Sequence, residues 1–174
     1  MWQLCRNFRT HSGVVKLANS VVEQVLRFFP LSIDRMDPEY SQVTGPRPII
    51  LESAYDIVTE LFQSKTGGGA LQFGAEQVIL VRDEETKRQL TTIAGRNALV
   101  LTVLEAKGME FTDCLIYNFF KSSPLTKEWR VLYSADNSWD KARTEFDPSR
   151  HGALCTELKL LYVLLTRARQ HLLL

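Results

Sequence analysis

The sequence predicts an α/β fold in which helices cover both faces of a parallel sheet. Short apolar runs recur near residues 49, 78, 99 and 115, and strands buried on both faces of a parallel sheet are continuous apolar runs of this kind. Helical patterns or short crossovers separate the runs, as parallel strands require. A chain of 174 residues can bury roughly two-thirds of its unfolded surface. We therefore expect one domain over residues 1–174.

A core-facing helix is expected over residues 14–29. Apolar residues recur there at i, i+3 and i+4, and Pro30 ends the pattern. Thr10 or Ser12 is the expected N-cap. The preceding residues 1–9 look like a strand that runs out into a binding edge.

Residues 31–47 are rich in aspartate, proline and glycine, a composition that favours a surface loop. Residues 48–51 predict a short strand, and Ser53 begins a further helix with an apolar face. The triple glycine at 67–69 predicts a turn. A phosphate-cradling loop would need a preceding strand, a following helix and a G-K-[ST] ending, and the sequence around these glycines shows none of the three.

The second half of the chain continues the alternation of strands and helices. Tryptophans, prolines and many charges interrupt it over residues 121–150, where we expect an irregular excursion. The expected elements are a strand at 78–81, a helix at 83–90, strands at 99–103 and 114–119, a helix at 153–169, and a last strand that begins at His171.

Charge and cysteine content argue against a strongly basic nucleic-acid-binding protein, a disulfide-bonded protein and a metal site. With 21 basic and 20 acidic residues the net charge is +1, so any attraction to nucleic acid must be local. Cys5, Cys114 and Cys155 fit buried free thiols in a reducing compartment. The chain contains no CxxC or HxxxH pair, which argues against a metal site, and we expect its three histidines at the surface.

No apolar run approaches the roughly 20 residues of a membrane span, and no leader opens the chain. These features predict an intracellular protein, nuclear or cytoplasmic, with no membrane partner.

The polar loop between the runs at 99–103 and 114–119 is the first candidate site, because function is often carried by loops that a rigid scaffold positions. Its residues 102–111, TVLEAKGMEF, resemble motif V of the UvrD/Rep-like superfamily 1 helicases, T-x-H-x-x-K-G-L-E-F. Residues 4–10, LCRNFRT, resemble motif IV, and residues 157–168, ELKLLYVLLTRA, resemble motif VI. Three blocks in this order identify the chain as similar to the second RecA-like domain of that family.

The amino-acid sequence of the three blocks is most similar to the helicase segment of large tetratricopeptide- and ankyrin-repeat-containing proteins. The resemblance implies a P-loop-type sheet without the P-loop, and the sequence contains no G-x-x-x-x-G-K-[ST]. It also implies that a preceding RecA-like lobe of the same parent chain holds ATP and most Mg²⁺ ligands. We therefore expect the chain alone not to hydrolyse ATP, and its start and stop suggest a fragment.

By this resemblance, Arg9 and Arg167 are the catalytic residues that face the γ-phosphate, where charge develops as the bond breaks. Arginine suits this role because its planar guanidinium binds phosphate oxygens bidentately and stays charged. Phe8 would stack on adenine, and Glu110 would accept a hydrogen bond from the ribose, so that Phe8, Arg9, Glu110 and Arg167 bind the nucleotide.

Thr102, Lys107 and Gly108 would meet a single-stranded nucleic acid, which this lobe alone would bind weakly. Leu104 stands in place of the family's motif V histidine, and Leu158 in place of a motif VI basic residue. These two changes favour an alternative, a catalytically inactive helicase-like interaction module in a large repeat protein.

Each site residue has a structural alternative. Arg167 could be a cation that the helix dipole favours at a helix C-terminus. Lys107 and Glu110 could be solvated loop charges, and Phe8 could belong to the core.

Overall fold

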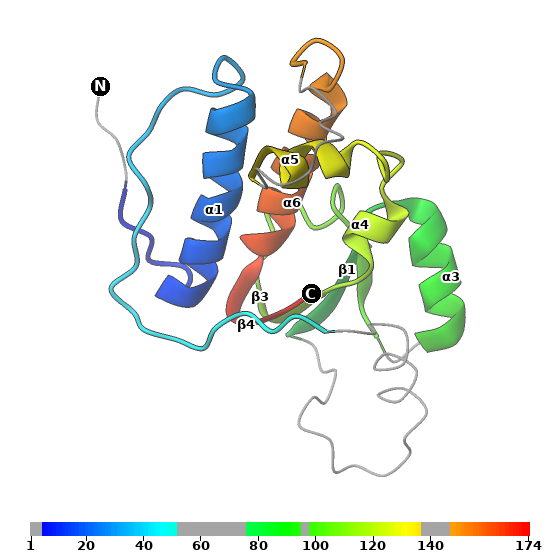
Figure 1. The fold of residues 1–174 in the computed structure, drawn as a ribbon. Coiled ribbons are helices and arrows are strands. Elements are labelled where there is room, and N and C mark those ends of the chain that lie inside the picture. Colours follow the sequence, from blue (N-terminus) through cyan, green and yellow to red (C-terminus); the bar gives the residue numbers. More distant parts are fainter. Residues whose placement is uncertain (1–4, 52–75, 95–97, 137–146) are drawn as a thin grey trace.

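The computed structural model describes residues 5–51, 76–94, 98–136 and 147–174. Figure 1 shows a central sheet with helices packed against it. The strands are β1 (Gln77–Val81), β2 (Val100–Thr102), β3 (Phe111–Ile116) and β4 (Ala168–Leu173). The helices are α1 (Ser12–Phe28), α3 (Glu84–Ala94), α4 (Phe119–Ser122), α5 (Trp129–Asp136) and α6 (Gly152–Leu165).

The four strands form one parallel sheet in the order β2-β1-β3-β4. The expected strand near residue 49 is reduced to a single parallel bridge between Ile49 and Leu173, beside the outer edge of β4. Two backbone hydrogen bonds flank it, from Ile49 N to Leu172 O and from Leu174 N to Ile49 O, each 2.9 Å long. The α/β class with a parallel sheet is thus confirmed.

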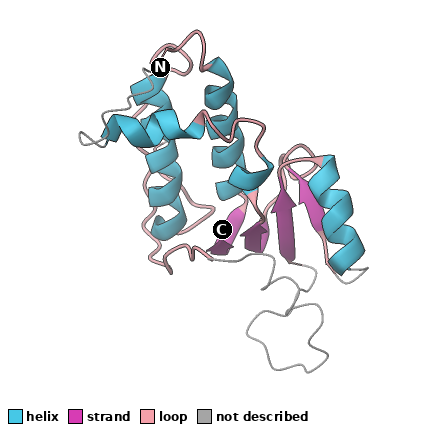
Figure 2. Cartoon of the chain, turned by 45° about the vertical axis from the view of Figure 1, so that its right-hand side comes forward, coloured by secondary structure: helices cyan, strands magenta, loops and turns pink. Residues whose placement is uncertain are grey.

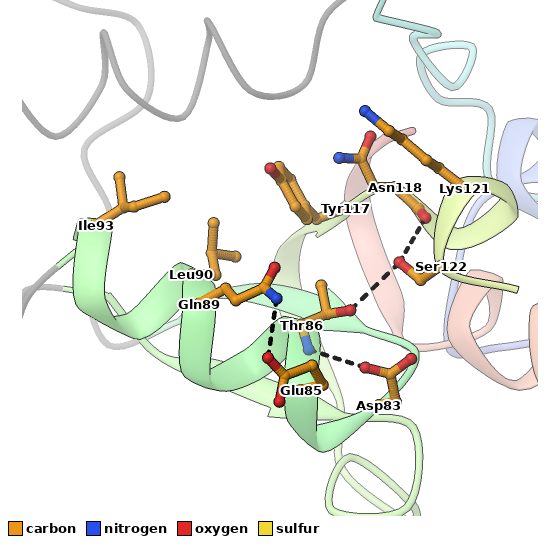
Figure 3. A pocket seen from close by; sticks show the side chains of 10 residues that line it. All are labelled: Asp83, Glu85, Thr86, Gln89, Leu90, Ile93, Tyr117, Asn118, Lys121 and Ser122. Carbon is orange, nitrogen blue, oxygen red and sulfur yellow. Dashed lines mark hydrogen bonds between the residues drawn. The ribbon is translucent and has the colours of Figure 1, made fainter.

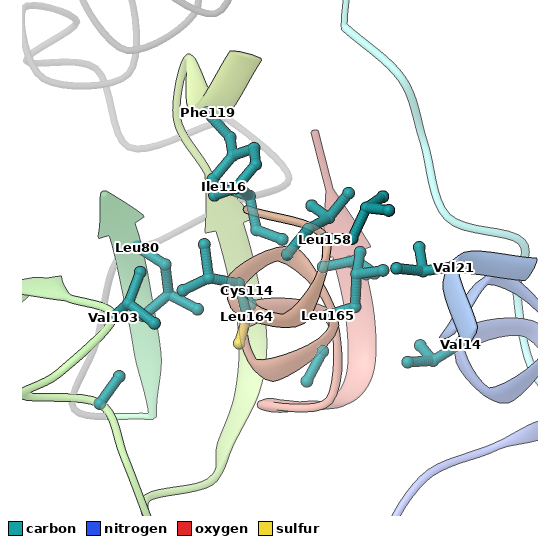
Figure 4. Close-up of a cluster of buried hydrophobic side chains, with 14 of the residues drawn as sticks. Val14, Val21, Leu80, Val103, Cys114, Ile116, Phe119, Leu158, Leu164 and Leu165 are labelled. Carbon is teal, nitrogen blue, oxygen red and sulfur yellow. The ribbon is translucent and has the colours of Figure 1, made fainter. Parts of the chain in front are cut away.

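Helices cover both faces of the sheet, as predicted. Side chains alternate between the faces along each strand, so the strands contribute to two cores. Val78, Leu80 and Cys114 pack with α1 and α6, whereas Ile79 and Leu115 pack with Leu90 of α3. Figure 2 shows α3 on one side of the strands and the other helices on the opposite side, and Figure 4 shows the larger core, with Leu164 and Leu165 beside Cys114.

The connection from β2 to β3 is a short crossover, defined here as residues 103–110. It starts at the carboxyl end of β1, where Val103 N donates to Val81 O, and ends at the amino end of β3. Val103 and Ala106 are buried in the larger core, and Val103 lies beside Leu80 in Figure 4. The crossover therefore packs on the α6 side of β1. It places its polar residues along a path from the carboxyl ends of the strands to their amino ends.

Several predicted boundaries are corrected by the structure. The last helix ends at Leu165 and not near residue 169, because Ala168 already begins β4. The strand predicted at 114–119 begins at Phe111 and ends at Ile116, since Asn118 adopts a left-handed conformation and α4 follows. Residues 31–47 form the expected loop, and α5 lies inside the predicted irregular stretch 121–150. The helix predicted from Ser53 and the triple glycine lie outside the described residues.

The N-cap prediction for the first helix was wrong, since His11 and not Thr10 or Ser12 caps α1. The Nδ1 atom of His11 accepts a hydrogen bond from Gly13 N at 3.1 Å. The proton must then be on Nε2, which donates to Gln170 O at 2.6 Å. A side chain on Gly45 would collide with this ring, because its Cβ would lie 2.2 Å from His11 Cγ.

His11 and His151 are therefore buried, and the prediction that all histidines lie at the surface was wrong for these two. His151 is tied to the backbone of Asp147, 2.9 Å from its carbonyl oxygen. His171 is exposed and lies 2.6 Å from the Asp113 carboxylate.

The three cysteines are free thiols, with Cys114 and Cys155 buried and Cys5 half-buried. Among the described residues, no helix combines the length and the apolar character of a membrane span.

Candidate functional site

Two arginines and one glutamate gather at the amino ends of β3 and β4. Glu110 directly precedes β3 and Arg167 directly precedes β4, and Phe111 N donates to Arg167 O at 3.0 Å. The Arg9 guanidinium forms an ion pair with the Glu110 carboxylate. Their side chains are 45% and 36% exposed, so a ligand can reach both. We call Arg9, Glu110 and Arg167 the arginine cluster.

Arg167 is held in one orientation by three hydrogen bonds. Its Nε donates to Val163 O at 2.9 Å, and its Nη1 donates to Met109 O at 3.0 Å. Its Nη2 donates to the Thr166 hydroxyl at 3.3 Å. The guanidinium thus binds a carbonyl of the last turn of α6, as the structural alternative expects of a cation at a helix C-terminus, and it also joins this helix end to the crossover through Met109 O.

The pKa of Arg167 is shifted by the other charges of the arginine cluster and by burial. Burial lowers the pKa of Arg167, the nearby charge of Arg9 lowers it further, and the Glu110 carboxylate opposes both. Arginine nevertheless stays charged at neutral pH. Two positive charges and one negative charge leave an excess positive charge, and guanidinium groups bind phosphate and carboxylate oxygens bidentately.

Phe8 lies beside the cluster and is not part of the core. Its side chain is 78% exposed, and the guanidinium carbon of Arg6 lies 4.6 Å from its ring centroid. A depression of about 350 Å³ is lined by Phe8, Arg9, residues 43–46 and residues 169–171. The ring is therefore exposed, with the Arg6 guanidinium over one of its faces, and the core alternative for Phe8 was wrong.

The residues predicted to contact nucleic acid do not lie at one end of the sheet. Thr102 ends β2 at the carboxyl edge and is 4% exposed. Its backbone N donates to a Glu105 carboxylate oxygen at 2.9 Å and its hydroxyl lies 3.1 Å from the same oxygen. Glu105 also binds Lys87, and these hydrogen bonds, from Lys87 first and then Thr102, lower the pKa of Glu105. Thr102 fixes the start of the crossover.

Lys107 and Gly108 are both exposed on the crossover, on its way to Glu110. Gly108 has φ +84° and would have no atom within 4 Å of an added Cβ. A glycine is thus needed here for backbone conformation and not for close packing. Leu104 is 79% exposed on the same crossover, whereas Leu158 is 3% exposed in the core, where a charged side chain would need a partner.

A second depression, of about 440 Å³, opens at the carboxyl ends of β1 and β3. Figure 3 shows α3 on one side of it and Tyr117, Asn118 and Lys121 on the other. Many of its polar atoms bind one another: Asp83 accepts from Thr86 N at 2.8 Å, and Ser122 donates to Asn118 O at 2.9 Å. Its lining carries two carboxylates, Asp83 and Glu85, and one lysine, Lys121, whereas the arginine cluster holds two cations and one carboxylate.

The sequence analysis did not identify two carboxylates that organise the site, Glu105 and Glu39. Glu105 is recognisable, because it follows Thr102 by three residues, the spacing of a capping box. Glu39, which contacts Asn7 and Tyr162 beside the arginine cluster, lies in a loop with no pattern to mark it.

The fold and the site define an α/β protein with an exposed cationic cluster at the amino edge of a parallel sheet. The sequence is similar to human TPR and ankyrin repeat-containing protein 1, with 37% identity over 193 aligned residues. The alignment covers 98% of this chain and 7% of that protein, so the chain spans a small part of the relative's length. No protein-family model matches the chain.

Proposed function

We propose that this chain is the second RecA-like lobe of a UvrD-like, ATP-dependent nucleic-acid helicase or translocase. The observation that carries the proposal is the arginine cluster, in which Arg9 and Arg167 lie together although they come from opposite ends of the chain. The 7% coverage of the human relative is consistent with a lobe of a much larger protein.

In this proposal the lobe closes over ATP that a preceding lobe holds together with Mg²⁺. Arg167, already oriented by Val163 O and Met109 O, presents its guanidinium to the γ-phosphate. Cations placed there stabilise charge that develops in the transition state. Arg9 would leave its ion pair with Glu110 for the phosphate, which frees Glu110 to accept from the ribose. The exposed ring of Phe8 would stack on adenine.

The single-strand contacts of the proposal lie along Lys107, Gly108 and the start of the crossover. Lys107 is exposed and can meet a phosphate. Thr102 is buried, so it would act through the shape of the turn that presents Lys107.

The test is ATP turnover by the longer protein that contains this lobe. Arg167→Ala should lower kcat by about 10³ or more with nucleotide affinity changed less than tenfold, because such an arginine acts mainly in the transition state. Arg167→Lys should not restore turnover, since an ammonium cannot make two parallel hydrogen bonds. The measurements are kcat, ATP affinity and melting temperature for each variant. The control is Arg130→Ala, which removes an exposed arginine of α5.

Equal turnover in wild type, Arg167→Ala and Arg167→Lys would refute the catalytic role. The second candidate, a non-catalytic interaction module, would then be preferred. The observation that favours it is the exposure of Leu104 (79%) and Met109 (48%) on the crossover, because exposed apolar side chains suit a protein partner better than a phosphate backbone.

A further inference from the structure

Glu39 lies in the loop of residues 31–47 and contacts three separate parts of the chain. Its carboxylate accepts from Asn7 Nδ2 at 2.9 Å and from the Tyr162 hydroxyl of α6 at 3.4 Å. Its backbone oxygen accepts from Asn19 Nδ2 of α1 at 2.7 Å. Glu39 therefore connects the N-terminal segment to α1 and α6 beside the arginine cluster.

Asn7 links Glu39 to Arg9 through hydrogen bonds of its side-chain amide. Its Oδ1 accepts from Arg9 N at 2.9 Å and from Thr10 N at 3.1 Å, an Asx turn that sets the direction in which Arg9 leaves the backbone. The amide orientation of Asn7 is unambiguous, because reversing it would aim its NH₂ group at two backbone N–H donors. The segment is also bound to the loop by Asn7 N to Tyr40 O and Tyr40 N to Cys5 O, each 2.8 Å long.

Tyr162 places the second contact of the Glu39 carboxylate on α6. It lies in the last turn of that helix, whose C-cap Thr166 directly precedes Arg167. Burial raises the pKa of the Tyr162 hydroxyl, and the Glu39 carboxylate raises it further, against the charges of Arg9 and Arg167. The hydroxyl therefore remains a donor to Glu39 at neutral pH.

We infer that Glu39 is a positioning residue for the arginine cluster: its carboxylate fixes the turn that carries Arg9 against α6, the helix that ends at Leu165, two residues before Arg167. The inference rests on the proposed function and deepens it. Without this carboxylate the Asn7 amide loses its anchor, and the Arg9 turn can shift relative to α6. Glu39 would touch neither substrate nor metal.

The first test needs no nucleotide. In the 174-residue chain, Glu39→Ala should speed amide hydrogen exchange at Arg9 and Thr10 by about tenfold, the effect of losing about one hydrogen bond. Exchange in α3 serves as the reference for global stability, because α3 makes no contact with Glu39 among the interactions described. Glu39→Gln, which keeps one acceptor oxygen, should have a smaller effect. Glu23→Ala removes an exposed carboxylate of α1 and should have none.

The second test uses ATP turnover by the longer protein. Glu39→Ala should lower kcat at least about tenfold, and it should add nothing once Arg9 is replaced by alanine, because residues that act through one another are not additive. A purely structural role would lower turnover equally in both backgrounds.

Unchanged exchange at Arg9 and Thr10 relative to α3 would overturn the inference, and so would full additivity with Arg9→Ala. If the wild-type protein hydrolyses no ATP but Glu39→Ala still accelerates exchange at Arg9 and Thr10, the positioning of Arg9 by Glu39 is supported and only the proposed function fails.

Discussion

Gly108 in the crossover has a backbone that other residues avoid, with φ +84°. An added methyl group would meet no atom within 4 Å, so Gly108→Ala tests backbone strain alone. We expect it to lower the free energy of unfolding by about 1–2 kcal/mol, the cost of a left-handed conformation for an L side chain. Urea denaturation provides the measurement.

The matched control is Gly152→Ala at the start of α6, where an added Cβ also has open space and no positive φ is recorded. This change should be neutral or stabilise by up to about 1 kcal/mol, because alanine favours the helix and restricts the unfolded chain. Equal effects of the two substitutions would show that the crossover relaxes to accept alanine.

The Cys114 thiol is strongly perturbed by its surroundings. Burial, and then the Asp113 carboxylate, raise its pKa from 9.0 to about 12, against the charge of Arg167. Since only the thiolate reacts, iodoacetamide at pH 8.5 should label the half-buried Cys5 at least about 100-fold faster than Cys114. Peptide mass mapping over time measures both rates, and comparable rates would contradict the structure.

The same shift has a consequence for stability at high pH. The pKa of Cys114 is higher in the folded chain than in the unfolded chain, so the unfolded state loses this proton first as pH rises. The contribution of Cys114 to stability is therefore complete below pH 9 and falls as pH rises toward 12. It has no role in acid denaturation.

At the scale of elements, one buried ion pair joins β1 to α6. The Arg82 guanidinium, directly after β1, donates to both carboxylate oxygens of Glu157, at 2.9 Å from Nε and 2.6 Å from Nη2. The Glu157 side chain is 5% exposed and that of Arg82 is 19% exposed. Arg82→Met should cost about 3 kcal/mol of stability, because it leaves a buried carboxylate without a partner.

Replacing both partners should recover most of this loss, since apolar side chains of similar volume do not need a counter-charge. Arg82→Met with Glu157→Leu should lie within about 1 kcal/mol of wild type. The exposed pair Arg88–Glu85 is the control, and Arg88→Met should cost less than about 1 kcal/mol. An equal cost for Arg82→Met and Arg88→Met would mean that water reaches Glu157.

For the whole molecule, the near-zero net charge predicts weak binding to nucleic acid. Twenty-one basic residues are balanced by twenty acidic ones, so positive charge that could meet a phosphate is local, as at the exposed Lys107 and at the arginine cluster. We expect the chain alone to bind labelled single strands weakly, with an affinity that falls steeply as salt rises from about 50 to 200 mM. Nanomolar affinity at 200 mM salt would contradict this prediction.

The class of fold and most of the described helices and strands could be predicted from local sequence patterns. The 3.6-residue period of α1 and the apolar runs at 78–81, 99–101 and 114–116 are local consequences of burial, so they can be recognised without knowing the neighbouring elements. The element ends were less predictable. The helix at the end of the chain was extended too far because Leu164, Leu165 and Ala168 continue an apolar pattern that serves first α6 and then β4.

The contacts between distant residues follow from the folded chain. The motif resemblance already grouped Arg9, Glu110 and Arg167, but the physical reason that Glu110 and Arg167 meet is that β3 pairs with β4 and that the crossover passes back over β1, and the local apolar pattern shows neither fact. The burial of His11 depends on Gln170 O, and the role of Glu39 depends on Asn7 and Tyr162. Each of these depends on a partner distant in sequence, since hydrogen bonding of a buried polar group is satisfied by the folded chain as a whole. Local periodicity carries no information about such partners.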